Sequence, residues 1–194
     1  MVFQSRIYSV LVVSAAEKFN DALIKLLPEA QYGPVTFADN VAAARRKLLD
    51  RTYDFVLINA PLPDDFGSKL AMDVCRNSGM VALLLVKNEV LEEINAKVLD
   101  HGVFTLSKPT SPQTLMQCLQ WMISARERLR GFEKKAASID EKMEEIRLVN
   151  RAKWLLIECL SMTEADAHRY IEKQAMDRCV SRREIAQGII QTYA

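Results

Sequence analysis

The chain has 194 residues, of which 49% are apolar, and its 26 Lys and Arg nearly balance its 25 Asp and Glu. This length suits one medium-sized domain and a smaller one, and the composition argues against a collagenous, mucin-like or wholly disordered protein. No apolar run approaches the roughly 20 residues of a membrane helix, and no secretory signal is recognisable. We therefore expect a cytoplasmic protein that makes no membrane contact. The balanced charge predicts that any nucleic-acid contact is compact and local.

Cysteine and histidine usage predicts no metal site, no disulfide framework and no cofactor. The four cysteines are scattered without a CxxC pair, and the chain has only two histidines, at positions 101 and 168. No cysteine forms a recognisable nucleophile–base motif with either histidine, and no glycine-rich loop follows the first predicted strand. We therefore predict that the chain is not an enzyme.

The first 110 residues alternate short apolar segments with segments of helical periodicity. The apolar segments have the continuous character of strands buried on both faces of a parallel sheet, and they lie at 9–13, 35–37, 55–58, 81–86 and 103–106. Helical patterns lie between them at 17–27, 41–50, 68–77 and 91–100. This alternation predicts an α/β fold with five parallel strands, whose functional crevice lies at the carboxyl ends of the strands.

From Leu115 the pattern is continuously helical, with apolar residues at positions a and d of five heptads and no proline. This favours a parallel coiled-coil homodimer. We assign the dimerisation helix to 122–146, with the seam residues Met122, Ala125, Leu129, Phe132, Ala136, Ile139, Met143 and Ile146. Arg128 and Lys135 at g could meet Glu133 and Asp140 at e of a second copy, whereas Lys142 would repel Arg147. The alternative is a long helix that folds back on the α/β domain.

The remaining residues, 147–194, predict three short helices. The first continues from the coil to Ile157, the second begins at Thr163 with Asp166 three residues on, and the third begins at Ser181 with Glu184 three residues on. Both spacings are typical of capping boxes. The expected core of this module consists of Leu156, Ile157, Ala167, Tyr170, Ile171, Ala175, Ile185, Ile189 and Ile190.

Four segments of this tail form a motif at fixed offsets: 150–156 (NRAKWLL), 163–167 (TEADA), 174–176 (QAM) and 183–186 (REIA). Together they resemble the ANTAR domain that ends the AmiR/NasR class of transcription antitermination regulators. Trp154 and Arg151 depart from the family pattern, which commonly has glycine and glutamine there. The resemblance implies an RNA-binding module at 147–194 that acts as a dimer on hairpin loops of nascent leader transcripts.

Residues 1–121 resemble the flavodoxin-like receiver domain of two-component systems, but most residues of its phosphorylation site are replaced. Ser14, Ala15 and Ala16 stand where the resemblance implies an acidic cluster, and Asn59 stands at the phosphoacceptor position. Leu85 or Val86 takes the hydroxyl position, and only Lys108 with its following proline remains. An amide cannot form an acyl phosphate, and Ser and Ala offer no carboxylate to a hard cation. We therefore expect a pseudo-receiver in which Lys108 bonds Asn59, and the resemblance implies a cis peptide bond between Lys108 and the following proline. Asp64 and Asp65 are interpreted as turn residues.

The predicted RNA surface combines guanidinium groups with one aromatic ring. It consists of Arg147, Arg151, Lys153, Trp154, Arg182 and Arg183. RNA loops are recognised by stacking and by contacts to base edges and phosphates, which these side chains could supply. The alternative interpretation buries Trp154 in the core or at the coil edge and leaves Arg182 and Arg183 as solvated first-turn residues. A second alternative is an interaction protein whose tail docks a partner protein, and a sequestering regulatory protein or a ligand could control either form. A phosphorylation-switched regulator is disfavoured by Asn59.

Overall fold

A computed structural model describes residues 6–77 and 79–193. The chain divides into two compact units, Met1–Gly131 and Phe132–Ala194, and helix α5 (Pro112–Leu160) contributes to both. The first unit thus extends beyond the boundary at 121 that we expected, because α5 continues to pack on the sheet after that point. None of the helices within the described ranges is long and apolar enough to cross a membrane.

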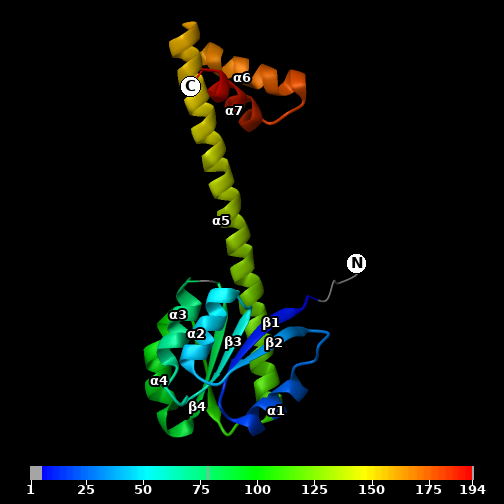
Figure 1. Ribbon diagram of the computed structural model, residues 1–194, viewed down its shortest axis with the longest axis vertical. Helices are drawn as coiled ribbons and strands as arrows, with labels where there is room; N and C mark the ends of the chain where they lie inside the picture. Colours follow the sequence, from blue (N-terminus) through cyan, green and yellow to red (C-terminus); the bar gives the residue numbers. More distant parts are fainter. Residues whose placement is uncertain (1–5, 78, 194) are drawn as a thin grey trace. The chain divides into compact units, whose positions relative to one another are not determined.

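The first unit is the predicted five-stranded parallel sheet (Figure 1). The strand order is β2 (Tyr32–Ala38), β1 (Tyr8–Val13), β3 (Phe55–Asn59), β4 (Val81–Lys87) and β5 (Phe104–Lys108). The other helices are α1 (Glu17–Leu26), α2 (Val41–Asp50), α3 (Ser68–Asn77) and α4 (Leu91–Val98), with 3-10 turns at Asn88–Val90 and Leu99–His101. All the predicted strands and helices of this region are observed, with ends that shift by a few residues.

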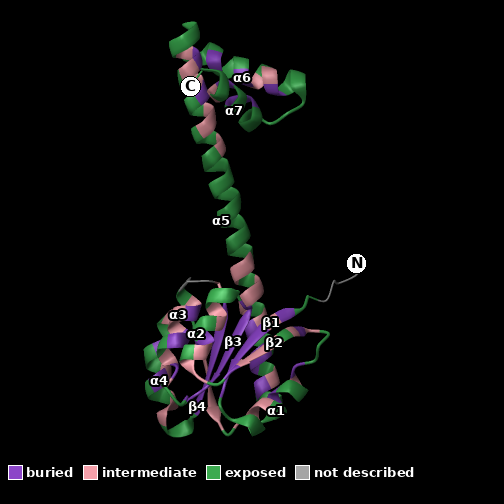
Figure 2. Ribbon diagram, in the orientation of Figure 1, coloured by how far each residue is buried: buried purple, intermediate pink, exposed green. Residues whose placement is uncertain are grey.

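Two apolar layers cover the sheet because successive side chains of each strand point to opposite faces. Leu11 and Val13 join one core with residues of α2, α3 and α4, whereas Val10 and Val12 join another with residues of α1 and α5. The central strand β3 is buried along its whole length, and buried residues run through the sheet in Figure 2. This double burial explains why the strands are continuous apolar runs rather than alternating ones.

The first part of the predicted dimer seam belongs instead to the core of this unit. Met122 is completely buried on the sheet, and Ala125 and Leu129 pack against the same core. The assignment of Met122 to a coiled-coil seam was therefore wrong. The physical reason is that a helix buries the same a and d stripe whether it packs on a sheet or on a second helix.

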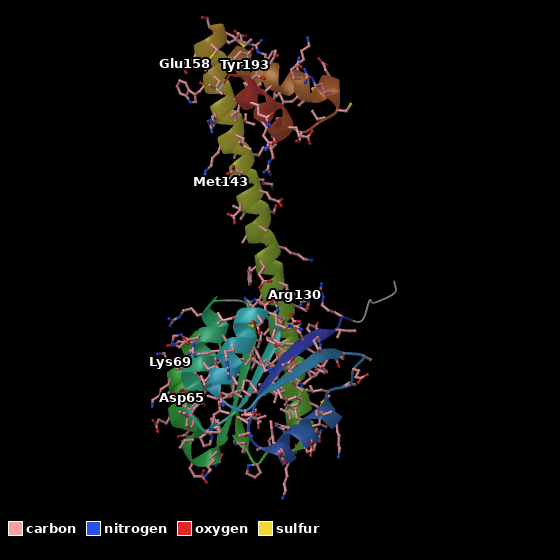
Figure 3. The ribbon with its side chains drawn as sticks, viewed as in Figure 1. Asp65, Lys69, Arg130, Met143, Glu158 and Tyr193 are labelled. Carbon is pink, nitrogen blue, oxygen red and sulfur yellow. The ribbon has the colours of Figure 1, made fainter. Side chains whose placement is uncertain are left out.

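An ionic cluster ties α5 to the start of β3. The Asp54 carboxylate accepts hydrogen bonds from the Ser9 amide at 3.0 Å and from Arg126 Nε at 3.1 Å, and it pairs with Arg130. All three ionic side chains are largely buried, at 11% exposure for Asp54 and Arg126 and 18% for Arg130. Figure 3 labels Arg130. Burial raises the pKa of Asp54, but Ser9 and the two guanidinium groups outweigh it and hold this pKa below its ordinary value.

The second unit consists of the last turns of α5 together with α6 (Glu164–Arg178) and α7 (Arg182–Tyr193) (Figure 1). Its small core is formed by Ala152, Leu156, Ala167, Ile171, Ala175, Ile185, Ala186 and Ile189. Thr163 caps α6 by accepting from the Asp166 amide at 3.2 Å, and Ser181 accepts from the Glu184 amide at 3.2 Å. Both predicted helix starts are therefore confirmed. Tyr170, expected in the core, is exposed instead, because it lies one position before the buried Ile171.

Candidate functional site

The carboxyl ends of three strands meet in a hydrogen-bonded chain of neutral and cationic side chains. Lys108 Nζ at the end of β5 donates to Asn59 Oδ1 at 2.6 Å and to the Ala60 carbonyl oxygen. Asn59 Nδ2 in turn donates to Ser14 Oγ at 3.0 Å, which also accepts from the Ala16 amide. The expected contact between Lys108 and Asn59 is present, and the Lys108–Pro109 peptide bond is cis.

Burial and the nearby Lys87 lower the pKa of Lys108. Its hydrogen-bond acceptors are an amide oxygen and a carbonyl oxygen, both uncharged. Lys108 is half-buried, whereas Ser14 and Asn59 beside it are buried, Ala15 is exposed, and Val86 is buried at the end of β4. The crevice therefore holds a cation and neutral dipoles where a phosphorylation site requires carboxylates.

The two aspartates on the loop after β3 have structural partners of their own. The Asp64 carboxylate accepts hydrogen bonds from the amides of Val41 and Ala42, at 2.9 and 3.0 Å, and so caps α2. These two amides hold the pKa of Asp64 below its ordinary value. Asp65, labelled in Figure 3, accepts from the Gly67 amide at 2.6 Å. Among the residues that the structure describes, no group of three or more His, Cys, Asp or Glu side chains could hold a metal ion.

In the second unit, three of the predicted RNA-binding residues project from one exposed part of α5. Trp154 is 69% exposed, which contradicts the alternative that buries its side chain in the core of this unit and leaves open the coil edge. Arg147 and Arg151 are exposed as well, and Arg147 has only a loose ionic contact with Glu144 at 3.9 Å. These three residues are spaced four and three apart, which places them along one helix face.

The other three predicted residues differ in how they are held. Lys153 is mostly buried and donates to Glu164 of α6 at 3.1 Å. Arg182 pairs with Glu145 of α5, with nitrogen–oxygen distances of 3.1 and 3.0 Å. Arg183 is exposed on the first turn of α7. Lys153 and Arg182 thus connect the helices of this unit, a role that residue type and spacing did not reveal.

Two hollows lie on this unit. One, of about 250 Å³, is lined by Asn150, Lys153, Trp154, Ile157 and Glu164. The other, of about 310 Å³, lies between α6 and α7, and its lining includes Tyr170, Gln174, Arg178 and Tyr193. Sequence reasoning missed the second hollow, because it treated Tyr170 as a core residue.

Comparison with known proteins separates the same two parts of the chain. Residues 137–190 match the ANTAR domain family. The transcriptional regulatory protein PdtaR of Mycobacterium tuberculosis is 29% identical over 142 residues, which cover 72% of this chain and 68% of that protein. The ANTAR match begins inside the segment that we assigned to the coiled coil, so the family pattern includes part of the exposed length of α5.

Solved structures resemble the first unit. A signal receiver domain of an HD domain-containing protein from Pseudomonas fluorescens is 25% identical and superposes with a TM-score of 0.58 over 68% of this chain and 96% of that one. A CheY-like receiver domain from Methanospirillum hungatei, 20% identical, superposes with a TM-score of 0.56 over 63% and 98% of the two chains. Receiver fold and ANTAR match occur in one polypeptide, and the chain is therefore similar to response regulators that carry an ANTAR domain.

Proposed function

We propose that the chain is an RNA-binding antitermination regulator that acts as a dimer on hairpin loops of nascent leader transcripts, without phosphorylation of its α/β unit. The observation that carries the RNA proposal is the exposure of three guanidinium groups, those of Arg147, Arg151 and Arg183, in or beside the helices of the ANTAR match. PdtaR is by name a transcriptional regulator, which supports a role in transcription.

The exposed guanidinium groups have the chemistry that single-stranded RNA requires. A guanidinium plane can stack on an unpaired base or bind a phosphate through two parallel hydrogen bonds. Arg183 also lies on the first turn of α7, where the helix dipole favours an anion. Lys153 and Arg182 would reach phosphate only by exchanging their carboxylate partners, so we assign them a smaller share of RNA affinity.

Dimerisation is supported by an apolar stripe along the exposed length of α5. Ile139 is 60% exposed, Met143 48% and Ile146 54%, and they repeat at heptad spacing. Lys135 and Asp140 occupy the g and e positions that would form an ion pair across a parallel pair of helices. A second copy would bury the stripe, and two RNA-binding units in one dimer would raise the effective concentration of the second after the first has bound.

The absence of phosphorylation is inferred from the crevice at the end of the sheet. Phosphoryl transfer needs a carboxylate nucleophile and a divalent cation. Asn59 offers a neutral amide instead, and the nearest loop carboxylates, Asp64 and Asp65, already accept backbone hydrogen bonds.

The experiment that tests the RNA proposal is titration of short labelled RNA hairpins with the purified protein at several salt concentrations. A duplex of the same length without a loop serves as the control ligand. We expect loop-dependent binding whose logarithmic affinity falls linearly with the logarithm of salt concentration. Equal binding of hairpin and duplex, or no salt-dependent binding, would refute the proposal. Saturable capture of a protein partner in its place would favour the interaction-protein alternative.

A further inference from the structure

The heptad numbering of α5 can be continued past Ile146, where we expected the coiled coil to end. Continuing the heptad past Ile146 places Asn150 and Ile157 at position a and Lys153 at position d. Val149 falls at g and Trp154 at e of the same two turns. Trp154 is thus a large apolar side chain, 69% exposed, on the flank of a seam that runs on into the second unit.

We infer that a second copy of the chain covers this face, so that the dimer seam continues from Ile146 to Ile157 and Trp154 packs on Val149 of the second copy. In a parallel pair, each g residue of one helix faces the e residue of the following heptad of the other. Val149 and Trp154 have this spacing and are both apolar, and Val149 packs against the core of its own unit while it stays only half-buried. Lys142 and Arg147, one heptad earlier, would repel. The extension therefore adds an attractive pair directly after the unfavourable one.

The polar residues of this segment are compatible with a seam. A single asparagine at position a is a known device that selects two parallel helices in register, because the two amides can bond each other. Lys153 at d has a side chain that is only 16% exposed, and its ammonium group is held by Glu164 at 3.1 Å. Its aliphatic stem can therefore lie along the seam while the charge stays paired outside it.

The surface also has room for the second helix. Asn150, Lys153, Trp154 and Ile157 line the hollow of about 250 Å³, and Glu164 closes one side. In a parallel coiled coil, a side chain of one helix inserts into a depression formed by residues of the other. A depression on the line of the seam, beside an exposed indole, is the geometry that such packing requires.

The inference deepens the proposed function and rests on its dimer. It assigns Trp154 to the contact between copies rather than to stacking on a base. It also holds the two RNA-binding units at a fixed spacing, instead of tethering them through a free helix end. An RNA whose two loops are separated differently would then bind through only one unit.

The test uses the full chain and a single tryptophan. The chain has two tryptophans, Trp121 and Trp154, so a Trp121→Phe background leaves Trp154 as the only indole. We expect its emission to shift to the red on dilution, over the same concentration range in which sedimentation reports dissociation of the dimer. Trp154→Ala should raise the dimer dissociation constant by about 30-fold or more, as truncation of a buried interface tryptophan does. The matched control Met176→Ala, which removes another exposed apolar side chain of the same unit, should leave it within about twofold.

The other outcomes separate this inference from the proposed function. Solvent-like emission in the dimer, with an unchanged dissociation constant but weaker hairpin binding for Trp154→Ala, would overturn the inference and assign the indole to RNA. A protein that stays monomeric at all concentrations would overturn both the inference and the proposed dimer. Asn150→Leu should tighten association and populate larger oligomers, and unchanged stoichiometry together with unchanged affinity would exclude Asn150 from the seam. A wild-type dimer that forms but does not bind the hairpins would refute only the proposed RNA-binding function.

Discussion

The ionic cluster around Asp54 allows a sharp prediction about the stability of the α/β unit. Asp54→Asn keeps the size of the side chain but removes the negative charge that lies between Arg126 and Arg130. Because all three side chains are largely buried, the variant removes a buried carboxylate that both guanidinium groups contact, while Arg130 keeps its pair with Glu127 at 3.0 Å. Removing one partner from a buried ion pair typically costs about 3–5 kcal/mol. We expect about 3 kcal/mol, because the amide oxygen can still accept the hydrogen bond from the Ser9 amide.

The matched control is Asp73→Asn, which breaks the pair between Asp73 and Arg45. Its two atoms lie at a similar distance, 2.7 Å, but the side chains are 35% and 47% exposed. Exposed pairs contribute about 0–1 kcal/mol, so the control should change stability little. Urea unfolding can be followed by the emission of Trp121 in a Trp154→Phe background. With an m value of about 2 kcal/mol/M, the Asp54→Asn midpoint should fall by about 1.5 M and the Asp73→Asn midpoint by less than about 0.5 M.

The pH dependence provides an independent check. The folded pKa of Asp54 lies below the ordinary value, so the carboxylate contributes stability that is complete above its unfolded pKa of about 3.9 and is lost as pH falls through the folded pKa. The wild type and Asp54→Asn should therefore differ by a constant amount above about pH 5 and converge in acid. A loss no greater than that of Asp73→Asn, or a difference that persists unchanged into acid, would refute the reasoning.

Three further predictions concern the crevice, the dimer and the RNA surface. Incubation with acetyl phosphate and magnesium should leave the intact mass of wild type and of Asn59→Asp unchanged, because Ser14 and Ala15 supply no carboxylate for a cation. A labile phosphoryl adduct near position 59 in the wild type would contradict this. Ile139→Asp should convert the dimer to a monomer, as measured by light scattering, whereas the control Ala137→Asp, at an outer b position, should not. A dimer that survives Ile139→Asp would place the interface elsewhere. Arg183→Ala should weaken hairpin binding and reduce the slope of logarithmic affinity against logarithmic salt concentration by about one unit. Arg182→Ala should chiefly lower the melting temperature of the second unit, because it removes the contact with Glu145. Equal salt slopes for wild type and Arg183→Ala would show that Arg183 does not contact the RNA.

The elements of the fold were predictable because each depends on local periodicity and end signals. Buried parallel strands are continuous apolar runs, and Thr163 and Ser181 carry the spacing of helix caps, so these features follow from nearby residues alone. The partner of a helix stripe is not local information. Met122 and Met143 both occupy heptad position a, yet Met122 is buried on the sheet and Met143 is 48% exposed.

The features of the candidate site that depend on residue type, such as the replaced carboxylates, were predictable from the sequence. The features that depend on contacts between residues far apart in the sequence were less so. The replaced carboxylates could be recognised residue by residue. The contact between Lys108 and Asn59 followed from the receiver resemblance, although β4 lies between their two strands. The cap that Asp64 provides for α2 joins residues more than 20 positions apart, as its hydrogen bond to Val41 shows. The pairing of Arg182 with Glu145 spans 37 positions. Such contacts decide whether a charged side chain is available to a ligand, and spacing along the sequence does not report them.

The crevice of the α/β unit is held together by hydrogen bonds among its own residues. A partly buried ammonium group is costly unless hydrogen-bond acceptors surround it. Asn59 and Ala60 provide acceptors for Lys108, and Ser14 accepts a hydrogen bond from the Asn59 amide nitrogen, so these bonds link the ends of β5, β3 and β1. A carboxylate at position 59 would strengthen the contact with Lys108, but without acidic neighbours it would still lack the cation that phosphoryl transfer requires. A crevice without the acidic cluster can therefore still use the lysine, because the lysine holds strand ends together. A single acid introduced at position 59 would not by itself create a phosphorylation switch.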